Sequence, residues 1–338
     1  MLVRVPDYYH HFRCLADRCP HSCCEKWEVV LDDEHVSLYK SLTGPLGDKL
    51  RSAMVQDAEG DVCFALHGNR CPFLDDENLC EIHRQLDESA TSITCQEHPR
   101  FTEDFGPFRE ITLSASCPAA NDLLLGSEAP LHFVEWEDSA PTEEGDDWLP
   151  FLLPLRETML AILQNRNYPL HHRLSAFLGL AEQAQTRLDT ELESELPNLM
   201  VDWTQPASAN GEGLFPAALH LLDRLEILEA DWHDLLHRAE TVDSYHCAPA
   251  LLERIAVYFT FRYLLKCVND GDLLSRAQLV VFAVLTVERL TAVCGLAEAL
   301  RRFSCEIEHN EENLSTLLEA FCYGEGFSLP CFFQTLTQ

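Results

Sequence analysis

The pattern of apolar and polar positions differs between the two halves of the chain. From residue 149 onward, apolar residues recur at intervals of three and four, which places them on one face of a helix. Leu252, Ile255, Phe259 and Tyr263 form the clearest such stripe. This periodicity predicts helices over residues 149–164, 170–192, 216–239, 249–268 and 273–293, the third of them broken near Asp231.

Residues with strong local preferences mark the ends of these helices. Pro249 suits the first turn of a helix, where its missing N–H group has no partner to lose. The residues Asn269, Asp270 and Gly271 end that helix, because glycine readily adopts the left-handed conformation of a helix C-terminus. Asp272 is suited to cap the next helix. The second half is therefore predicted to be an all-helical bundle.

The first half has only short periodic stretches, which predict a helix over 33–42 and a strand over 109–113. Residues 126–147 contain eight acidic residues, two prolines and no Lys or Arg, a composition that repels itself and buries little. We expect a mainly α protein in three parts. These are an irregular cysteine-rich metal-binding module over residues 1–125, an acidic linker over 126–147 and a helical domain over 148–338.

Cysteines are concentrated in the first part of the chain, which holds nine of the 15 within its first 117 residues. Eight of these nine have Arg, Asp, His, Ser and Pro as neighbours, surroundings that do not suit buried hydrophobic thiols. Such a dense run is typical of thiolate ligands for a metal ion or an iron–sulfur cluster. The predicted ligands are Cys14, Cys19, Cys23, Cys24, Cys71, Cys80, Cys95 and Cys117.

Disulfide formation and simple burial are the two alternatives to metal binding for these thiols. A disulfide framework suits small secreted domains, whereas this chain has 338 residues, an odd number of cysteines and no apolar signal core at its N-terminus. Burial as small hydrophobic side chains is the interpretation we prefer for the cysteines of the helical half with apolar neighbours. That group comprises Cys247, Cys267, Cys294 and Cys322, while Cys63, Cys305 and Cys331 are taken as ordinary thiols.

The spacing of the eight cysteines leaves the number and type of centres open. Cys23 and Cys24 are adjacent, and side chains of neighbouring residues diverge, so one of them can serve a second centre. Eight thiolates suffice for two four-thiolate sites or for one cluster with spare sulfurs, and spacing does not distinguish iron–sulfur from zinc. His83 and His98 each follow a cysteine by three residues, but we favour surface or supporting roles for them because sulfur is plentiful.

Charge and the absence of other motifs narrow the function. The formal charge of −32 repels nucleic acid and anionic lipid, so neither is an expected partner. The longest uncharged apolar stretch, 277–287, is shorter than the ~20 residues needed to cross a bilayer, and we expect a cytoplasmic protein. The G-x-G sequences at 211–213 and 324–326 follow no apolar strand, so a Rossmann-type nucleotide site has little support.

Several segments together resemble the flagellin lysine-N-methylase family of bacterial cysteine-cluster proteins. They are residues 23–27 (CCEKW), 71–74 (CPFL), 79–82 (LCEI), 94–100 (TCQEHPR) and 113–118 (LSASCP), with 261–266 (FRYLLK) in the helical half. His98 stands where that family has an apolar or aromatic residue, and His83 where it has no ligand, which agrees with supporting roles for both.

The resemblance implies a protein-lysine N-methyltransferase that acts on flagellin, uses S-adenosylmethionine and carries an iron–sulfur cluster of the 4Fe-4S type, with zinc as the alternative. Lysine has a pKa of ~10.4, so such a site must desolvate the amine or take its proton before the nitrogen attacks a methyl group. The sequence identifies no catalytic base and no cofactor-binding residue. A non-catalytic, zinc-stabilised adaptor that binds partners through its helices is the alternative function.

Overall fold

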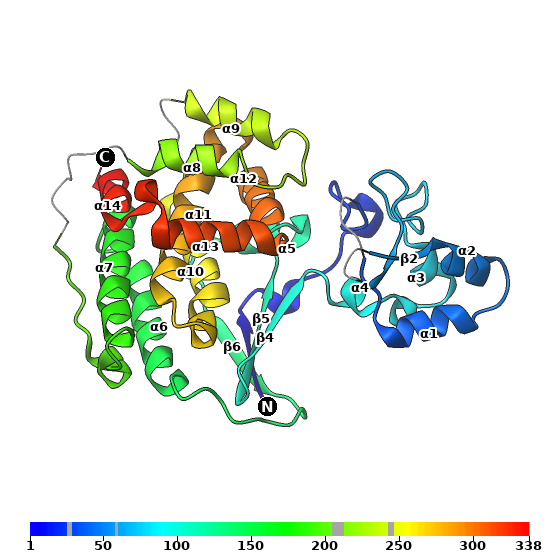
Figure 1. Ribbon diagram of the computed structural model, residues 1–338, viewed down its shortest axis with the longest axis horizontal. Helices are drawn as coiled ribbons and strands as arrows, with labels where there is room; N and C mark the ends of the chain where they lie inside the picture. The colour runs from blue at the N-terminus through cyan, green and yellow to red at the C-terminus, as the bar shows by residue number, and fades with distance from the viewer. Residues whose placement is uncertain (26–28, 58–59, 205–212, 243–246, 338) are drawn as a thin grey trace.

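The computed structural model describes residues 1–25, 29–57, 60–204, 213–242 and 247–337. Figure 1 shows a larger unit, the body, joined to a small lobe. The body comprises the described parts of residues 1–12 and 99–337, and the small lobe those of residues 13–98. The chain leaves the body after its first strand, forms the small lobe, and returns in the segment that leads into the body's sheet.

Helix α11 (Leu273–Cys294) forms the centre of the body. Every residue from 275 to 287 is buried, so the helix is enclosed on all sides. It packs against α7 (Leu170–Leu188), α9 (Trp232–Glu240), α10 (Pro249–Tyr263), α12 (Leu296–Phe303) and α13 (Glu311–Tyr323). Further helices complete the bundle, namely α6 (Leu149–Leu163), α8 (Leu214–Leu222) and α14 (Leu329–Thr337).

The predicted helices of the second half are confirmed in position and type. Helices α6, α7 and α10 begin at residues 149, 170 and 249 as expected, and the third predicted helix is divided into α8 and α9. Gly271 has a φ of 77°, and the Asp272 carboxylate accepts a hydrogen bond from the Ser275 N–H group at 3.0 Å. Every described element after residue 148 is helical, in agreement with the expected fold class.

Helix α11 is also the one helix in the described residues with the length and hydropathy to cross a membrane. Its apolar window extends beyond the 277–287 stretch considered in the sequence, and 67% of that window is buried inside the body. Because α11 packs against five other helices, its apolar composition is explained by its position in the core of the bundle.

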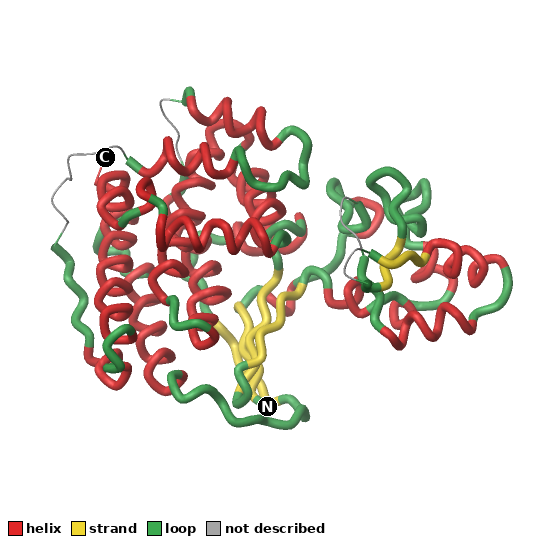
Figure 2. The backbone as a smooth tube through the Cα atoms, in the orientation of Figure 1, coloured by secondary structure: helices red, strands yellow, loops and turns green. Residues whose placement is uncertain are grey.

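A four-stranded sheet lies beside the helices, in the order β4 (Arg100–Asp104), β5 (Phe108–Leu113), β1 (Leu2–Pro6) and β6 (Phe133–Glu137). β1 runs parallel to β5 and antiparallel to β6, and β4 pairs antiparallel with β5. Figure 2 shows these strands as one ribbon of the body. Only β5 was predicted from the sequence; β1 and β5 pair although the whole small lobe separates them in the chain.

Strand β6 corrects the prediction that residues 126–147 form a plain acidic linker. Its backbone pairs with β1 along five residues, from Phe133 opposite Pro6 to Glu137 opposite Leu2. Phe133 stacks on Phe261 of α10 at 4.1 Å between ring centroids. Backbone pairing and aromatic contacts therefore give this segment a regular structure, which its acidic composition did not suggest.

Helix α5 (Pro118–Leu125) and the segment after β5 also join the buried cluster of the body. A separate, smaller cluster lies within the small lobe and includes Val36, Tyr39, Leu50 and Phe64. Its elements are α1 (Asp33–Ser41), α2 (Pro45–Ala53), β2 (Met54–Gln56), β3 (Val62–Phe64) and α3 (Glu81–Gln85), and α4 (Ile93–Glu97) completes the small lobe outside this cluster. The division of the chain into domains at residues 125 and 148 stays a prediction.

Glu110 of β5 and Arg156 of α6 form a fully buried ion pair that joins the sheet to the bundle, with N–O distances of 2.6 and 2.5 Å. Glu110→Gln is expected to lower the free energy of unfolding by about 3–5 kcal/mol, because Arg156 is left as an uncompensated buried charge. Urea denaturation of both proteins measures the change.

The matched control is Asp104→Asn, which removes the half-exposed Asp104–Arg109 pair of the same sheet. Its expected cost is below about 1 kcal/mol, since exposed pairs contribute little. Equal effects of the two substitutions would contradict the assignment of Glu110 and Arg156 as the joint between sheet and bundle.

Candidate metal centre

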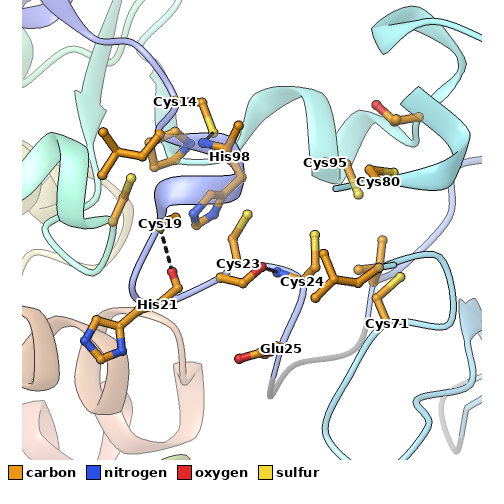
Figure 3. Close-up of a pocket in the computed structure, with 18 of the residues that line it drawn as sticks. Cys14, Cys19, His21, Cys23, Cys24, Glu25, Cys71, Cys80, Cys95 and His98 are labelled. Carbon is orange, nitrogen blue, oxygen red and sulfur yellow. Dashed lines mark hydrogen bonds between the residues drawn. The ribbon is translucent and has the colours of Figure 1, made fainter. Parts of the chain in front are cut away.

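All eight predicted ligand cysteines line one cavity of about 550 Å³ between the small lobe and the body. Seven belong to the small lobe, and Cys117 belongs to the body. None of the eight forms a disulfide. Figure 3 shows the cavity, with sulfur atoms reaching it from several separate segments. The structure thus brings together cysteines that are as much as 103 residues apart, from Cys14 to Cys117.

Short helices and turns aim backbone N–H groups at several of these sulfurs. Cys80 immediately precedes α3, and the backbone N–H groups of His83 and Ile82 act to lower the pKa of its thiol. Cys117 immediately precedes α5, where the N–H groups of Ala120 and Ala119 have the same effect. Such N–H donors favour the thiolate form, which is the form that binds metal.

Burial opposes that effect in the chain without bound ions. Desolvation, together with a smaller effect of nearby thiolates, raises the pKa of the Cys71 thiol to about 12 and that of the Cys95 thiol to about 11. The pKa of Cys24 is instead lowered to about 7, chiefly because its sulfur interacts with the Cys23 thiol by a hydrogen bond. Most of these thiols are therefore protonated at neutral pH until a cation displaces the protons.

The side chains are gathered around the cavity but not closed on an ion. Within the described ranges, no three His, Cys, Asp or Glu side chains are arranged as ligands of one metal ion. The donor set nevertheless fits a thiophilic metal, since eight thiols without disulfides line the same cavity. Binding would require the sulfurs to turn inward as they lose their protons.

The two histidines that follow cysteines also line the cavity. His83 is exposed, whereas His98 is half-buried, and burial lowers the pKa of His98 to about 4. His98 is therefore neutral at pH 7. Their predicted supporting roles stay predictions.

The body contributes cavity residues that the sequence did not single out. Glu229 and Arg301 form a buried bidentate ion pair at 2.8 Å, and Arg301 also donates to the sulfur of Cys305 at 3.5 Å. All three line the cavity. They come from the helical half, where no pattern pointed to a site, and only the three-dimensional fold brings them beside the cysteines.

A buried polar network holds the loop that carries Cys117. The His309 ring lies 2.8 Å from the hydroxyl groups of both Ser114 and Ser116. Beside it, Glu308 accepts hydrogen bonds from Tyr258, Tyr263 and Arg262. His309 and Glu308 lie at the end of a π-helical turn, Ser304–Glu308. The 113–118 segment is thus fixed to the body.

The remaining cysteines differ in how far they are buried. Cys267 and Cys63 are buried, and Cys247, Cys294 and Cys331 are half-buried. Cys322 is exposed and lies 3.1 Å from the Ser275 hydroxyl group, which corrects the expectation that it is a buried thiol. Cys322 lies near the end of α13 and is exposed, although the residues next to it in the sequence include apolar ones.

Comparison with known families gives two matches. Residues 13–115 match a family described as a putative zinc- or iron-chelating domain with the motif CxxCxxCC. Residues 156–220 match the FliB lysine N-methylase C-terminal domain. The resemblance to the flagellin lysine-N-methylase family is confirmed. Both the cysteine segment and part of the helical half belong to this similarity.

Curated relatives within this family are distant. The flagellar biosynthetic protein FliU of Salmonella muenchen is 26% identical over 133 residues, which cover 36% of this chain and 76% of that protein. The lysine-N-methylases of Salmonella choleraesuis and Salmonella typhimurium are each 27% identical over 133 residues. The match spans about a third of the length of these two methylases (32%) and 36% of this chain. No solved structure matches.

The raised thiol pKa values predict how the stability of the metal-free protein depends on pH. The folded-state pKa values of Cys71 and Cys95 exceed the unfolded value of ~8.5, so folding favours their neutral forms. The stability that the two neutral thiols contribute is fully present below pH ~8.5. It is lost as the pH rises through their folded-state pKa values of about 11 and 12. Urea denaturation in the presence of a chelator, at a series of pH values, measures this loss.

The Cys71→Ser/Cys95→Ser double variant provides the comparison, because serine does not titrate in this range. Wild-type protein is expected to lose stability more steeply than the double variant above about pH 9. Parallel curves for the two proteins would mean that these thiols are not desolvated as the structure indicates.

Proposed function

We propose that this chain is a protein-lysine N-methyltransferase that acts on flagellin, uses S-adenosylmethionine and carries a thiolate-bound iron–sulfur cluster. The observation that carries the proposal is the gathering of eight cysteine thiols at one cavity, in a chain related to lysine-N-methylases through both its cysteine segment and its helical half. The eight cavity cysteines are the proposed metal ligands. Because the curated methylases are matched over about a third of their length, the whole reaction is part of the proposal.

The proposed reaction is a polar displacement. A neutral lysine nitrogen attacks the methyl group of a sulfonium, the carbon–sulfur bond breaks as the nitrogen–carbon bond forms, and a neutral thioether leaves. The lysine ammonium must first lose its proton to a base or to water. A cavity between two lobes favours this step, since desolvation lowers the pKa of a bound ammonium group.

The charge of the chain supports a lysine-bearing substrate. Its formal charge of −32 attracts cationic side chains and increases the rate of their encounter with the protein. Glu25 and Glu88 lie at the cavity itself and place carboxylates where an approaching ammonium would meet them. Glu25 is paired with Arg70 at 3.0 Å, so Glu88 is the better candidate for the first contact.

The metal has a defined place in this proposal. Thiolates suit both an iron–sulfur cluster, our proposal, and zinc, and either would hold the cysteine-bearing segments in place around the cavity. The chain's own contribution is to hold the thiolates through backbone N–H groups and to enclose the cavity. The same proposal places the protein in the cytoplasm, without nucleic acid or membrane as partners.

One observation favours the alternative of a non-catalytic zinc-stabilised adaptor. Similarity to the two methylases covers about a third of their length, so most of their sequence has no counterpart in the match to this chain. In this alternative the cysteines hold zinc to stabilise the small lobe, and the helical body binds the partner. A colourless protein with stoichiometric zinc and no heat of binding with S-adenosylmethionine would support it.

Incubation of anaerobically purified protein with methyl-labelled S-adenosylmethionine and flagellin tests the proposed reaction. We expect labelled methyl-lysine in the flagellin by mass spectrometry. Flagellin with its lysines acetylated beforehand is the control and should stay unlabelled, because its nitrogens no longer act as nucleophiles. Absence of transfer by protein with its full metal content would overturn the methyltransferase assignment.

A further inference from the structure

The eight cavity cysteines do not form a single ring but two sets. The first consists of Cys24, Cys71, Cys80 and Cys95, all in the small lobe. Figure 3 shows their side chains together on one side of the cavity. Each of the six pairs within this set is close enough for one thiolate to raise the pKa of the other.

Backbone contacts fix the segments that carry the first set. The N–H group of Cys71 donates to the carbonyl oxygen of Cys24 at 2.8 Å, and Leu74 forms a β-bridge with Cys80. Cys71 and Cys80 also pack against the buried cluster of the small lobe. The first set therefore belongs wholly to the small lobe and extends its core.

The second set consists of Cys14, Cys19, Cys23 and Cys117, and it spans the two units. Cys14 and Cys19 lie close enough to Cys117 to raise its pKa, and Cys14 also raises the pKa of Cys19 and of Cys23. Cys24 of the first set has a smaller effect on Cys19. Cys117 packs against the core of the body, to which the Ser114–His309 and Ser116–His309 contacts hold its loop. Figure 3 shows Cys14 and Cys19 on the opposite side of the cavity from Cys71 and Cys80.

The adjacent residues Cys23 and Cys24 lie at the border between the sets. Cys23 interacts with Cys24 and Cys95 of the first set as well as with Cys14 of the second. Neighbouring side chains seldom bind one ion together, because they leave the backbone in different directions. Assigning Cys24 to the first set and Cys23 to the second gives each set four sulfurs, the number that tetrahedral zinc or a cubane cluster takes.

We propose that the cavity holds two metal centres with different roles: one bound by Cys24, Cys71, Cys80 and Cys95 that stabilises the small lobe, and one bound by Cys14, Cys19, Cys23 and Cys117 that fastens the small lobe to the body. This inference rests on the metal binding in the proposed function, and it adds the number of centres and the ligands of each.

The two roles follow from what each set connects. The small lobe has few buried apolar residues, and small cores commonly need a metal for stability. Loss of the first centre should therefore lower the stability of the small lobe. The second centre links a loop of the small lobe to Cys117 of the body across the cavity, where other contacts between the units include His21 with Glu298 at 3.7 Å. Its loss should free the small lobe without unfolding it.

Metal analysis of the anaerobically purified full chain tests the proposal. Iron, zinc and acid-labile sulfide are measured per chain in the wild type and in Cys71→Ser, Cys117→Ser and the double variant. We expect Cys117→Ser to keep half of the bound metal and the double variant to keep none. Cys305→Ala is the matched control, because Cys305 lines the same cavity but belongs to neither set, and it should keep all the metal.

Hydrogen–deuterium exchange separates the two roles. In Cys71→Ser, the amides of α1 and α2 should lose protection, whereas in Cys117→Ser they should stay protected. If Cys71→Ser fails to fold, the metal content of Cys117→Ser alone tests the proposal, because this substitution lies in the body and leaves the small lobe unchanged.

Loss of all metal, or of none, from Cys117→Ser would overturn the proposal, as would a wild-type content that fits one centre. These outcomes are independent of the methyltransferase assignment. Two centres without methyl transfer would contradict the methyltransferase assignment but support this inference. Methyl transfer by a protein with one centre would support the assignment but contradict this inference.

Discussion

The gathering of eight cysteine thiols at one cavity between the small lobe and the body is the constraint on which the proposed function depends. The sulfurs come from separate segments of the first 117 residues, and no disulfide joins them. Desolvation holds several of the thiols in their neutral form, as for Cys71 and Cys95. An ion bound by these thiols would have to supply the free energy that removes their protons, so the proposed metal binding would be coupled to the order of the small lobe.

The body gives this arrangement a rigid support. Its central helix, α11, is enclosed by other helices, and the buried Glu110–Arg156 pair joins the sheet to the bundle. The contacts of His309 with Ser114 and Ser116 attach the loop before Cys117 to the body. One thiol of the cavity is thus fixed to a large core, while the other seven belong to a lobe with a small one. Because the two cores differ in size, the proposed centres have different roles: one would stabilise the small lobe, and the other would connect the small lobe to the body.

Sequence reasoning recovered the parts of the fold that local patterns determine. Apolar periodicity located α6, α7 and α10, and the residues around Gly271 and Asp272 marked the boundary before α11. It missed β1 and β6 because their order comes from pairing between distant segments, and in β6 the acidic residues hid the aromatic contacts of Phe133. Cysteine density identified the eight thiols at the cavity. Spacing could not divide them into sets or reveal Glu229 and Arg301, since both depend on how the two units meet.

X-ray absorption at the edge of the bound metal tests the central claim most directly. Coordination by the cavity cysteines predicts a first shell of sulfur, at ~2.3 Å in the case of zinc, with about four sulfurs per metal atom. A first shell made mainly of oxygen and nitrogen would contradict it, because the metal would then be bound away from the thiols that define this cavity.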